Sequence, residues 1–156
     1  MKRALLLVAL ASPMVAQAAM AENTVLKCKT WQARRAAPVA GPVLVANVPR
    51  SMTPIDLNAV QFTDKPLTRQ VLVEGLFARR TETDTVEVTA RLVNCTDKPL
   101  QVQARSSFMD MTQAPTEPVS AWTQVFIPPK GTGTYRERSM SRDEVEYYLI
   151  ELAPGR

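Results

Sequence analysis

From residue 67 onward, apolar side chains recur at every second position within short segments. The cleanest case is residues 86–92, whose apolar members are Val86, Val88, Ala90 and Leu92. Successive side chains of a strand point to opposite faces of a sheet, so this period predicts a strand with one buried face. Glu87, Thr89 and Arg91 are expected to face water. A helix has a longer period, so this feature restricts the domain to strand-based folds.

Six further segments are predicted to be strands. They are residues 43–48, 71–75, 100–108, 122–127, 132–138 and 145–152. Pro, Gly, Asn and Asp occur between them at spacings typical of an antiparallel sandwich. A helix over residues 141–152 competes with the last of these strands, but β-branched residues and tyrosines favour the strand. We therefore predict an all-β fold, an immunoglobulin-like antiparallel β-sandwich of about seven strands.

A five-residue sequence, Thr-Asp-Lys-Pro-Leu, occurs at residues 63–67 and again at residues 96–100. A solenoid needs at least about three repeats with matching flanks, and the flanks of these two copies differ. We interpret the copies as the same turn leading into a strand, used twice. A duplicated hairpin is the alternative.

Prolines interrupt the region ahead of the sandwich, at Pro38, Pro42, Pro49, Pro54 and Pro66. Prolines at this density exclude a continuous helix. We predict an extended strap over residues 22–66 with one short strand at 43–48, followed by the sandwich domain at 67–156. Such a strap either lies along a partner or packs on the edge of its own domain, held there by Cys28.

The first 21 residues have the order of a secretory signal peptide. Lys2 and Arg3 precede an apolar run of about a dozen residues, shorter than the roughly 20 needed to span a bilayer. Small residues then permit cleavage before Ala19 or before Glu22, and we favour the second site. An uncleaved amphipathic helix is the alternative. This segment predicts an exported, periplasmic or secreted chain without a transmembrane anchor.

The chain has two cysteines, Cys28 and Cys95. The bacterial periplasm oxidises exposed pairs, so we expect a disulfide between them. That bond would join the N-terminal segment to the centre of the domain. Two unpaired thiols are the alternative, since the sequence does not establish their distance. Two thiolates without histidine form an incomplete zinc shell, so no metal site is predicted.

The sequence contains no histidine. This excludes Ser-His-Asp and Cys-His catalysis, histidine acid–base chemistry and imidazole metal ligands. An enzyme would then need two carboxylates facing a groove. Glu82 and Asp84 are expected in a solvated turn, and Glu144 and Glu146 on an exposed strand face. We therefore predict a non-catalytic protein without a cofactor.

Basic residues are spread along the chain rather than gathered in one segment. Removal of Lys2 and Arg3 with the signal peptide lowers the formal net charge from +4 to +2. A nucleic-acid partner requires a more basic surface with interleaved aromatic residues. We expect no such partner and interpret Arg79-Arg80 and the basic residues from Arg136 to Arg142 as solvated edge charges.

The order of motifs over residues 86–152 is similar to that of a known family. It comprises Leu-Val-Asn at 92–94, Thr-Asp-Lys-Pro-Leu at 96–100, Phe-Met-Asp at 108–110, Ala-Trp at 121–122 and Val-Phe-Ile-Pro-Pro-Lys-Gly at 125–131. This order resembles the YcfL-like family of small bacterial envelope proteins and, more broadly, the immunoglobulin-like accessory domains of periplasmic assemblies. The resemblance implies a sandwich fold and an envelope location, and it brings no catalytic residues. Members of that family are commonly lipidated, whereas Cys28 lies too far from the apolar run to accept a lipid.

These features together predict a non-catalytic accessory or structural subunit of a bacterial envelope assembly, such as a secretion, conjugation or pilus apparatus. Proteins of that assembly would bind along the strap or a sheet edge, with one or several copies of the chain in the assembly. We expect Trp31, Arg34 and Arg35 to make the contact, because aromatic and arginine side chains dominate binding hot spots. Packing of these three residues on their own domain is the alternative.

A different class of function is a periplasmic small-ligand or cell-wall binding module. It would use the loop at residues 110–122 with Arg105 and Tyr135 nearby, and a deep apolar pocket would support it. An enzyme without histidine is a third class. It would require two carboxylates about 5–10 Å apart in a groove.

Overall fold

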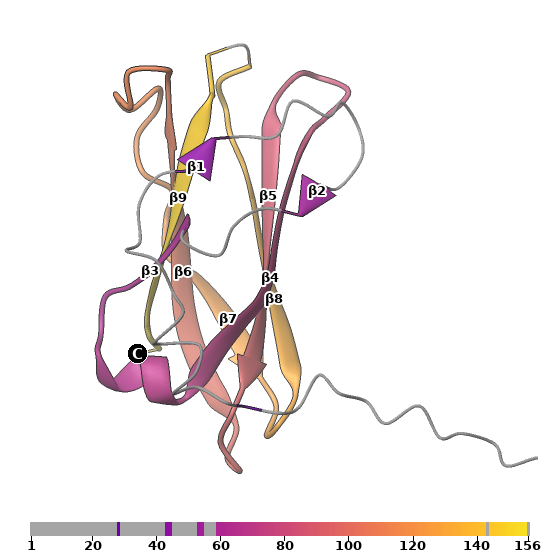
Figure 1. The fold of residues 1–156 in the computed structure, drawn as a ribbon, viewed down its shortest axis with the longest axis vertical. Helices are drawn as coiled ribbons and strands as arrows, with labels where there is room; N and C mark the ends of the chain where they lie inside the picture. The colour runs from indigo at the N-terminus through magenta and orange to yellow at the C-terminus, as the bar shows by residue number, and fades with distance from the viewer. Residues whose placement is uncertain (1–27, 29–42, 45–52, 55–58, 143, 156) are drawn as a thin grey trace, which may run out of the picture.

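The computed structural model describes Cys28 and residues 43–44, 53–54, 59–142 and 144–155. The predicted signal peptide at 1–21 and the predicted contact residues Trp31, Arg34 and Arg35 lie outside these residues. The described part of the chain is an all-β sandwich, as predicted (Figure 1). It contains no helix long and apolar enough to cross a membrane.

The described residues form strands and one short 3-10 helix. In chain order the elements are β1 (Val43–Leu44), β2 (Thr53–Pro54), β3 (Val60–Phe62), η3 (Pro66–Arg69), β4 (Val71–Arg80), β5 (Val86–Asn94), β6 (Leu100–Met109), β7 (Thr123–Ile127), β8 (Thr132–Arg138) and β9 (Tyr147–Pro154). The strand β8 has the predicted bounds, and β9 begins two residues later than predicted. The competing helix over residues 141–152 is excluded by the strand β9.

Two sheets pack face to face (Figure 1). Sheet A has the order β1-β9-β6-β7, with β3 also paired to β9, and sheet B has the order β2-β4-β5-β8. One pair departs from the predicted antiparallel arrangement, since β3 runs parallel to β9 with Val60 opposite Ile150. The strands β7 and β8 end their respective sheets on the same side of the sandwich.

Short strands from the predicted strap region extend both sheets. β1 pairs with β9, and β2 pairs with Phe77 and Ala78 of β4. A single strand is predicted in this region, at 43–48, whereas the structure also contains β2 and β3. Ala59 and Val60 are buried in the core, so the sandwich includes residues ahead of the predicted start at 67. Strands of two or three residues are too short to show an alternating pattern and depend on their pairing with β4 and β9.

Inward-facing residues of the two sheets form one core. The apolar residues of β5 predicted to be buried, Val86, Val88, Ala90 and Leu92, are all fully buried. The alternation in β4 changes phase at a bulge between Val73 and Gly75. The alternation of Val71 and Val73 predicts that Gly75 faces inward, whereas in the structure Leu76 and Ala78 take the following buried positions. An irregularity of this kind shifts every later side chain to the opposite face.

The two copies of Thr-Asp-Lys-Pro-Leu adopt different structures. In the first copy, the Asp64 carboxylate accepts a hydrogen bond from the Leu67 N–H at 3.2 Å, and the chain enters the 3-10 helix η3. In the second copy, the chain turns directly into β6, with the Thr96 hydroxyl donating to the carbonyl of Lys98 at 3.0 Å. The interpretation that both copies are the same turn into a strand is therefore wrong. The two copies also differ in their flanks, since the Asn94 oxygen accepts from Thr96 in the second copy and the corresponding position of the first copy is Gln61.

Two buried tyrosines differ in how their hydroxyl groups are satisfied. The Tyr135 hydroxyl lies 2.9 Å from the Ser106 hydroxyl and thereby links sheet B to sheet A. The Tyr148 hydroxyl has no hydrogen-bond partner among the described residues, and its side chain is fully buried. Burial raises the pKa of Tyr148, and it raises the pKa of Tyr135 to about 12. Both tyrosines therefore remain neutral at physiological pH.

Phenylalanine substitutions should separate these two environments. Tyr148→Phe removes a buried hydroxyl without a partner, so we expect the free energy of unfolding to stay constant or rise by up to about 1 kcal/mol. Tyr135→Phe leaves Ser106 without its partner and should lower the free energy of unfolding by about 1 kcal/mol. Urea unfolding of both variants measures the difference. A loss of stability in Tyr148→Phe equal to that in Tyr135→Phe would show that the Tyr148 hydroxyl does have a hydrogen-bond partner.

Candidate functional site

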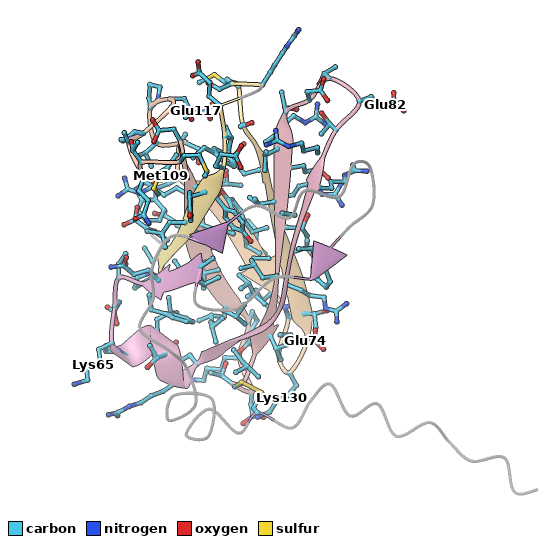
Figure 2. The ribbon with its side chains drawn as sticks, turned by 45° about the horizontal axis from the view of Figure 1, so that its top comes forward. Lys65, Glu74, Glu82, Met109, Glu117 and Lys130 are labelled. Carbon is cyan, nitrogen blue, oxygen red and sulfur yellow. A yellow bond between two sulfur atoms is a disulfide. The ribbon has the colours of Figure 1, made fainter. Side chains whose placement is uncertain are left out.

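The predicted disulfide is present at one end of the sandwich, which we call the base. Cys28 and Cys95 are bonded, with their Cα atoms 5.5 Å apart. Cys95 directly follows β5, and its N–H donates to the carbonyl of Gln70 at 2.7 Å. The Lys130 ammonium donates to the Cys95 carbonyl at 2.9 Å, and Figure 2 shows Lys130 at this end. The disulfide therefore fixes Cys28 to the end of a central strand.

Asn94 joins the two turns at the base, and its side chain is fully buried. Its amide nitrogen donates to the carbonyls of Lys98, Pro128 and Ile127 at 2.7, 3.1 and 3.2 Å. Its side-chain oxygen accepts from the N–H and hydroxyl of Thr96, both at 2.8 Å. The bonds to Thr96 and Lys98 are local bonds of the kind that Asn commonly makes in turns. The bonds to the β7–β8 turn join residues more than 30 positions apart and have no local sequence signal.

The strand β7 forms an open edge of sheet A. Within the described part of the chain it pairs only with β6, from Thr123 opposite Ala104 to Ile127 opposite Leu100. Its sequence, Thr-Gln-Val-Phe-Ile, carries no charge. The edge strand β8 of sheet B differs, since it contains Arg136, Glu137 and Arg138. Charged side chains are a common protection of strand edges against unwanted pairing, and β7 lacks that protection.

The C-terminal half of β7 lies close to β8. A Cβ at Gly133 of β8 would lie 2.9 Å from side-chain atoms of both Val125 and Ile127, and 3.3 Å from the Phe126 carbonyl oxygen. Only glycine permits this approach without a shift of the neighbouring atoms. The part of the β7 edge that lies farther from this approach is therefore its N-terminal half, at Thr123 and Gln124.

Aromatic side chains stand on the outer face of sheet A beside this edge. Phe126 is 69% exposed and Trp122, directly ahead of β7, is 38% exposed. The Arg105 guanidinium lies over the Trp122 ring, 4.5 Å from its centre, and pairs with Glu151 at 2.6 Å. We call this set, Trp122, Phe126, Arg105 and the edge of β7, the β7 surface.

A shallow groove adjoins the β7 surface near the base. Its volume is about 460 Å³, and its lining residues are Pro99, Leu100, Gln101, Phe126, Ile127 and Pro128. The lining is mostly apolar and comes from the start of β6 and the end of β7. The groove can therefore accept an apolar side chain of a bound segment.

The residues assigned to a ligand-binding loop separate in the structure. Arg105 and Trp122 are in contact, as expected from their assignment to one surface. Tyr135 is 1% exposed and lies in the core between the sheets, so its assignment to that surface is wrong. In β8 it is the one large apolar residue of an otherwise polar strand, and this is the sequence signal that marks it as inward-facing.

The carboxylates weighed for an enzyme lie in a turn or beside arginines, and Glu144 and Glu146 lie ahead of β9 rather than on a strand face as predicted. Glu82 and Asp84 belong to the turn between β4 and β5. Glu151 pairs with Arg105, and Glu146 lies 3.9 Å from Arg80. Asp143 lies outside the described residues.

Glu87 of β5 is buried rather than solvent-facing, which corrects the prediction. Its side chain is 4% exposed and lies beneath the guanidinium groups of Arg79, Arg138 and Arg136, at 2.9, 3.6 and 4.0 Å. Its neighbour on the same face, Thr89, is also buried. Both side chains belong to a central strand, so the long side chains of the flanking strands β4 and β8 cover them.

The arginines keep Glu87 ionised. Burial alone would raise the pKa of Glu87, but the hydrogen bond from Arg79 and the charges of Arg79, Arg136 and Arg138 outweigh burial and lower the pKa below its ordinary value of 4.5. A carboxylate with a lowered pKa stabilises the fold above its ordinary value, and this contribution is lost as the pH falls through the lowered value.

Glu87→Gln should therefore cost most stability near neutral pH. We expect a loss of about 2 kcal/mol at pH 7, because charge-assisted hydrogen bonds contribute at that scale. Below the lowered pKa of Glu87, wild type and variant should converge, which urea unfolding across the acid range measures. A difference between them that stays constant with pH would show that the carboxylate charge contributes nothing.

At least one solved structure has a fold similar to that of this chain. No protein-family model and no curated protein matches this chain. The structure is similar to that of cj0090 from Campylobacter jejuni, with 13% identity and a TM-score of 0.50, over 62% of this chain and 98% of that chain. For a DUF1425 family member from Shewanella sp. pv-4 the values are 11% identity and a TM-score of 0.43, over 75% and 98% of the two chains. The chain thus shares the sandwich fold of a bacterial protein, and at this identity the likeness concerns the fold alone.

Proposed function

We propose that this protein is a non-catalytic accessory subunit of a bacterial envelope assembly and that it binds an extended segment of a partner protein at the β7 surface. The observation that carries the proposal is an uncharged open strand edge flanked by two exposed aromatic side chains. An extended segment that pairs with such an edge forms main-chain hydrogen bonds, while pockets beside the edge select its side chains.

The side chains of the β7 surface suit a protein partner. Trp and Arg are enriched among the residues that dominate binding energy at interfaces. Arg105 is held in place by Glu151 and by the Trp122 ring, so little side-chain entropy remains to be lost on binding. The groove beside Phe126 offers an apolar site for one partner side chain.

The envelope location is supported by the sequence and the disulfide. The charged start, apolar run and small residues of segment 1–21 have the order of an export signal. A disulfide between Cys28 and Cys95 is compatible with an oxidising compartment such as the periplasm. The motifs at residues 86–152 resemble those of the YcfL-like family of envelope proteins. Trp31, Arg34 and Arg35 remain predicted contact residues, and they lie outside the described residues.

A photo-crosslinking amino acid at position 124 tests the partner interaction in the intact envelope. We expect it to capture a defined envelope protein, and the further substitution Phe126→Lys should abolish the capture because a charge on the edge opposes strand pairing. Phe126 is exposed, so this change should leave folding intact. The matched control is Thr134→Lys on the edge strand β8, which should leave capture unchanged.

Two outcomes would contradict the proposal. Loss of capture in Thr134→Lys to the same extent as in Phe126→Lys would show a non-specific charge effect. If the crosslinker captures only a second copy of this chain, the β7 surface mediates self-association rather than binding of a partner subunit.

A small-ligand or cell-wall binding module remains the second candidate, favoured by the Arg105–Trp122 stack on the outer face of sheet A. It predicts that the protein sediments with purified peptidoglycan and that Trp122→Ala abolishes sedimentation. The accessory-subunit proposal predicts no sedimentation in the absence of envelope proteins.

A further inference from the structure

Four arginines gather at the end of sheet B opposite the disulfide. Arg79 and Arg80 end β4, and Arg136 and Arg138 end β8. Figure 2 shows this end through Glu82, which lies at the far end of the sandwich from Lys130. A pocket of about 380 Å³ opens there, and its lining residues are Arg79, Arg80, Thr81, Glu82, Thr83 and Arg138. This volume is in the range of small-molecule sites.

The two arginines nearest the hairpin are held in place by the fold. Both Nε and a terminal nitrogen of Arg79 lie 2.9 Å from the same oxygen of Glu87. The Arg80 guanidinium donates to the carbonyls of Val145 and Arg142 at 2.9 and 3.2 Å. The first wall of the pocket is therefore preorganised, and a ligand that meets it loses little from the ordering of these side chains.

The guanidinium groups of Arg136 and Arg138 are only loosely engaged. Their closest described carboxylate is Glu87, at 4.0 and 3.6 Å, which is beyond hydrogen-bonding distance. No side-chain hydrogen bond of either guanidinium occurs among the residues that the structure describes, and the two side chains are 61% and 58% exposed. The Glu87 carboxylate thus lies near the guanidinium groups of Arg79, Arg136 and Arg138. Among the described residues, most N–H donors of these three groups have no acceptor.

The contribution to stability does not by itself explain why three arginines surround the buried Glu87. A buried ion cluster is often no more stabilising than apolar residues of similar volume, because its charges must be removed from water. At position 87, a branched apolar residue would cover the sheet without that cost. The carboxylate instead anchors Arg79 and lies near both Arg138, which lines the pocket, and Arg136, which does not line it.

We propose that this pocket binds a phosphate group. Guanidinium groups pair with phosphate through parallel N–H bonds. Here they come from two strands, so they can engage several oxygens of a tetrahedral anion, whereas a carboxylate offers only two oxygens. The pocket is larger than a phosphate ion and leaves room for an attached group of the size of glycerol. Such a phosphate belongs either to a soluble phosphorylated metabolite or to a lipid headgroup.

The negative charge of Glu82 opposes phosphate binding at this pocket. Glu82 is exposed and lines the pocket with a negative charge. Removal of that charge in Glu82→Gln should therefore strengthen phosphate binding, by about twofold to threefold for an exposed charge. A purely structural arginine cluster would show no such gain.

Titration with glycerol 3-phosphate and with inorganic phosphate tests the site. We expect the arginine Nε–H resonances of the full exported protein to shift in saturable fashion at low salt. In Arg136→Gln/Arg138→Gln the affinity should fall at least about tenfold, since each charge-assisted bond contributes more than 1 kcal/mol. The matched control is Arg91→Gln on the same face of β5, because Arg91 pairs with Glu74 away from the pocket. It should change the affinity less than about twofold.

Vesicles of phosphatidylglycerol in phosphatidylcholine distinguish the two sources of phosphate. Binding to these vesicles that is lost in Arg136→Gln/Arg138→Gln assigns the site to a lipid headgroup, and binding of glycerol 3-phosphate without vesicle binding assigns it to a soluble ligand. Absence of binding in both assays overturns the proposal, as does an equal loss in Arg91→Gln. If the glutamine variant does not fold, Arg136→Lys/Arg138→Lys keeps the charges but not the paired N–H geometry, and it should bind phosphate more weakly than wild type.

Discussion

Replacement of both cysteines by serine should lower the free energy of unfolding by about 4 kcal/mol, on the chain-entropy estimate for a long loop. The bond between Cys28 and Cys95 spans a sequence separation of 67 residues, so its loss gives the unfolded chain much additional freedom. Single domains are stable by only about 5–15 kcal/mol, which makes this loss a large fraction of the total. Urea unfolding of wild type and Cys28→Ser/Cys95→Ser measures the difference.

Reduction of the wild type provides the control for this prediction. Wild-type protein in reductant should unfold at the same urea concentration as the double serine variant, and reductant should not change the variant. A loss of less than about 1 kcal/mol would show that Cys28 contributes little to the stability of the sandwich.

Asn94→Leu should lower the free energy of unfolding by about 3 kcal/mol or more, because several buried polar groups lose their partners together. The carbonyls of Ile127 and Pro128 and the N–H of Thr96 all bond to this side chain. Leucine has the same number and branching of side-chain heavy atoms as asparagine and is not smaller, so the loss does not report a cavity. Thermal and urea unfolding of the variant measure the change.

Thr96→Val is the matched control for Asn94. It removes the local bonds of the hydroxyl to the Asn94 oxygen and to the carbonyl and N–H of Lys98, and it leaves the three bonds from the Asn94 amide in place. We expect a loss of about 1 kcal/mol or less for this partly exposed group. Equal decreases in the free energy of unfolding for Thr96→Val and Asn94→Leu would show that the bonds from Asn94 to the β7–β8 turn do not contribute to stability.

The long strands could be predicted because their alternation extends over many residues. Residues 86–92 show the period of two clearly, and the structure contains β5 at this position. The strand β3 has three residues, and its pairing with β9 is a non-local contact that no local pattern records. The bulge at Gly75 was missed for a similar reason, since it depends on the register of β4 against β5.

The candidate sites also differ in whether the sequence alone could predict them. The disulfide followed from the presence of two cysteines in a chain predicted to be exported, so it could be predicted without knowledge of the fold. The burial of Glu87 could not, because the side chains that cover it come from β4 and β8, and alternation alone marks it as solvent-facing. The β7 surface likewise depends on which strand ends sheet A, and sequence order does not determine this.

The position of Cys95 has a mechanical consequence. A pulling force on the chain ahead of Cys28 would pass through the disulfide to the end of β5, an interior strand of sheet B. Without that bond, the same force would reach β1, β2 and β3 first, and strands of two or three residues can be peeled from an edge one hydrogen bond at a time. The covalent link therefore passes tension applied ahead of Cys28 to an interior strand and bypasses the short strands β1, β2 and β3.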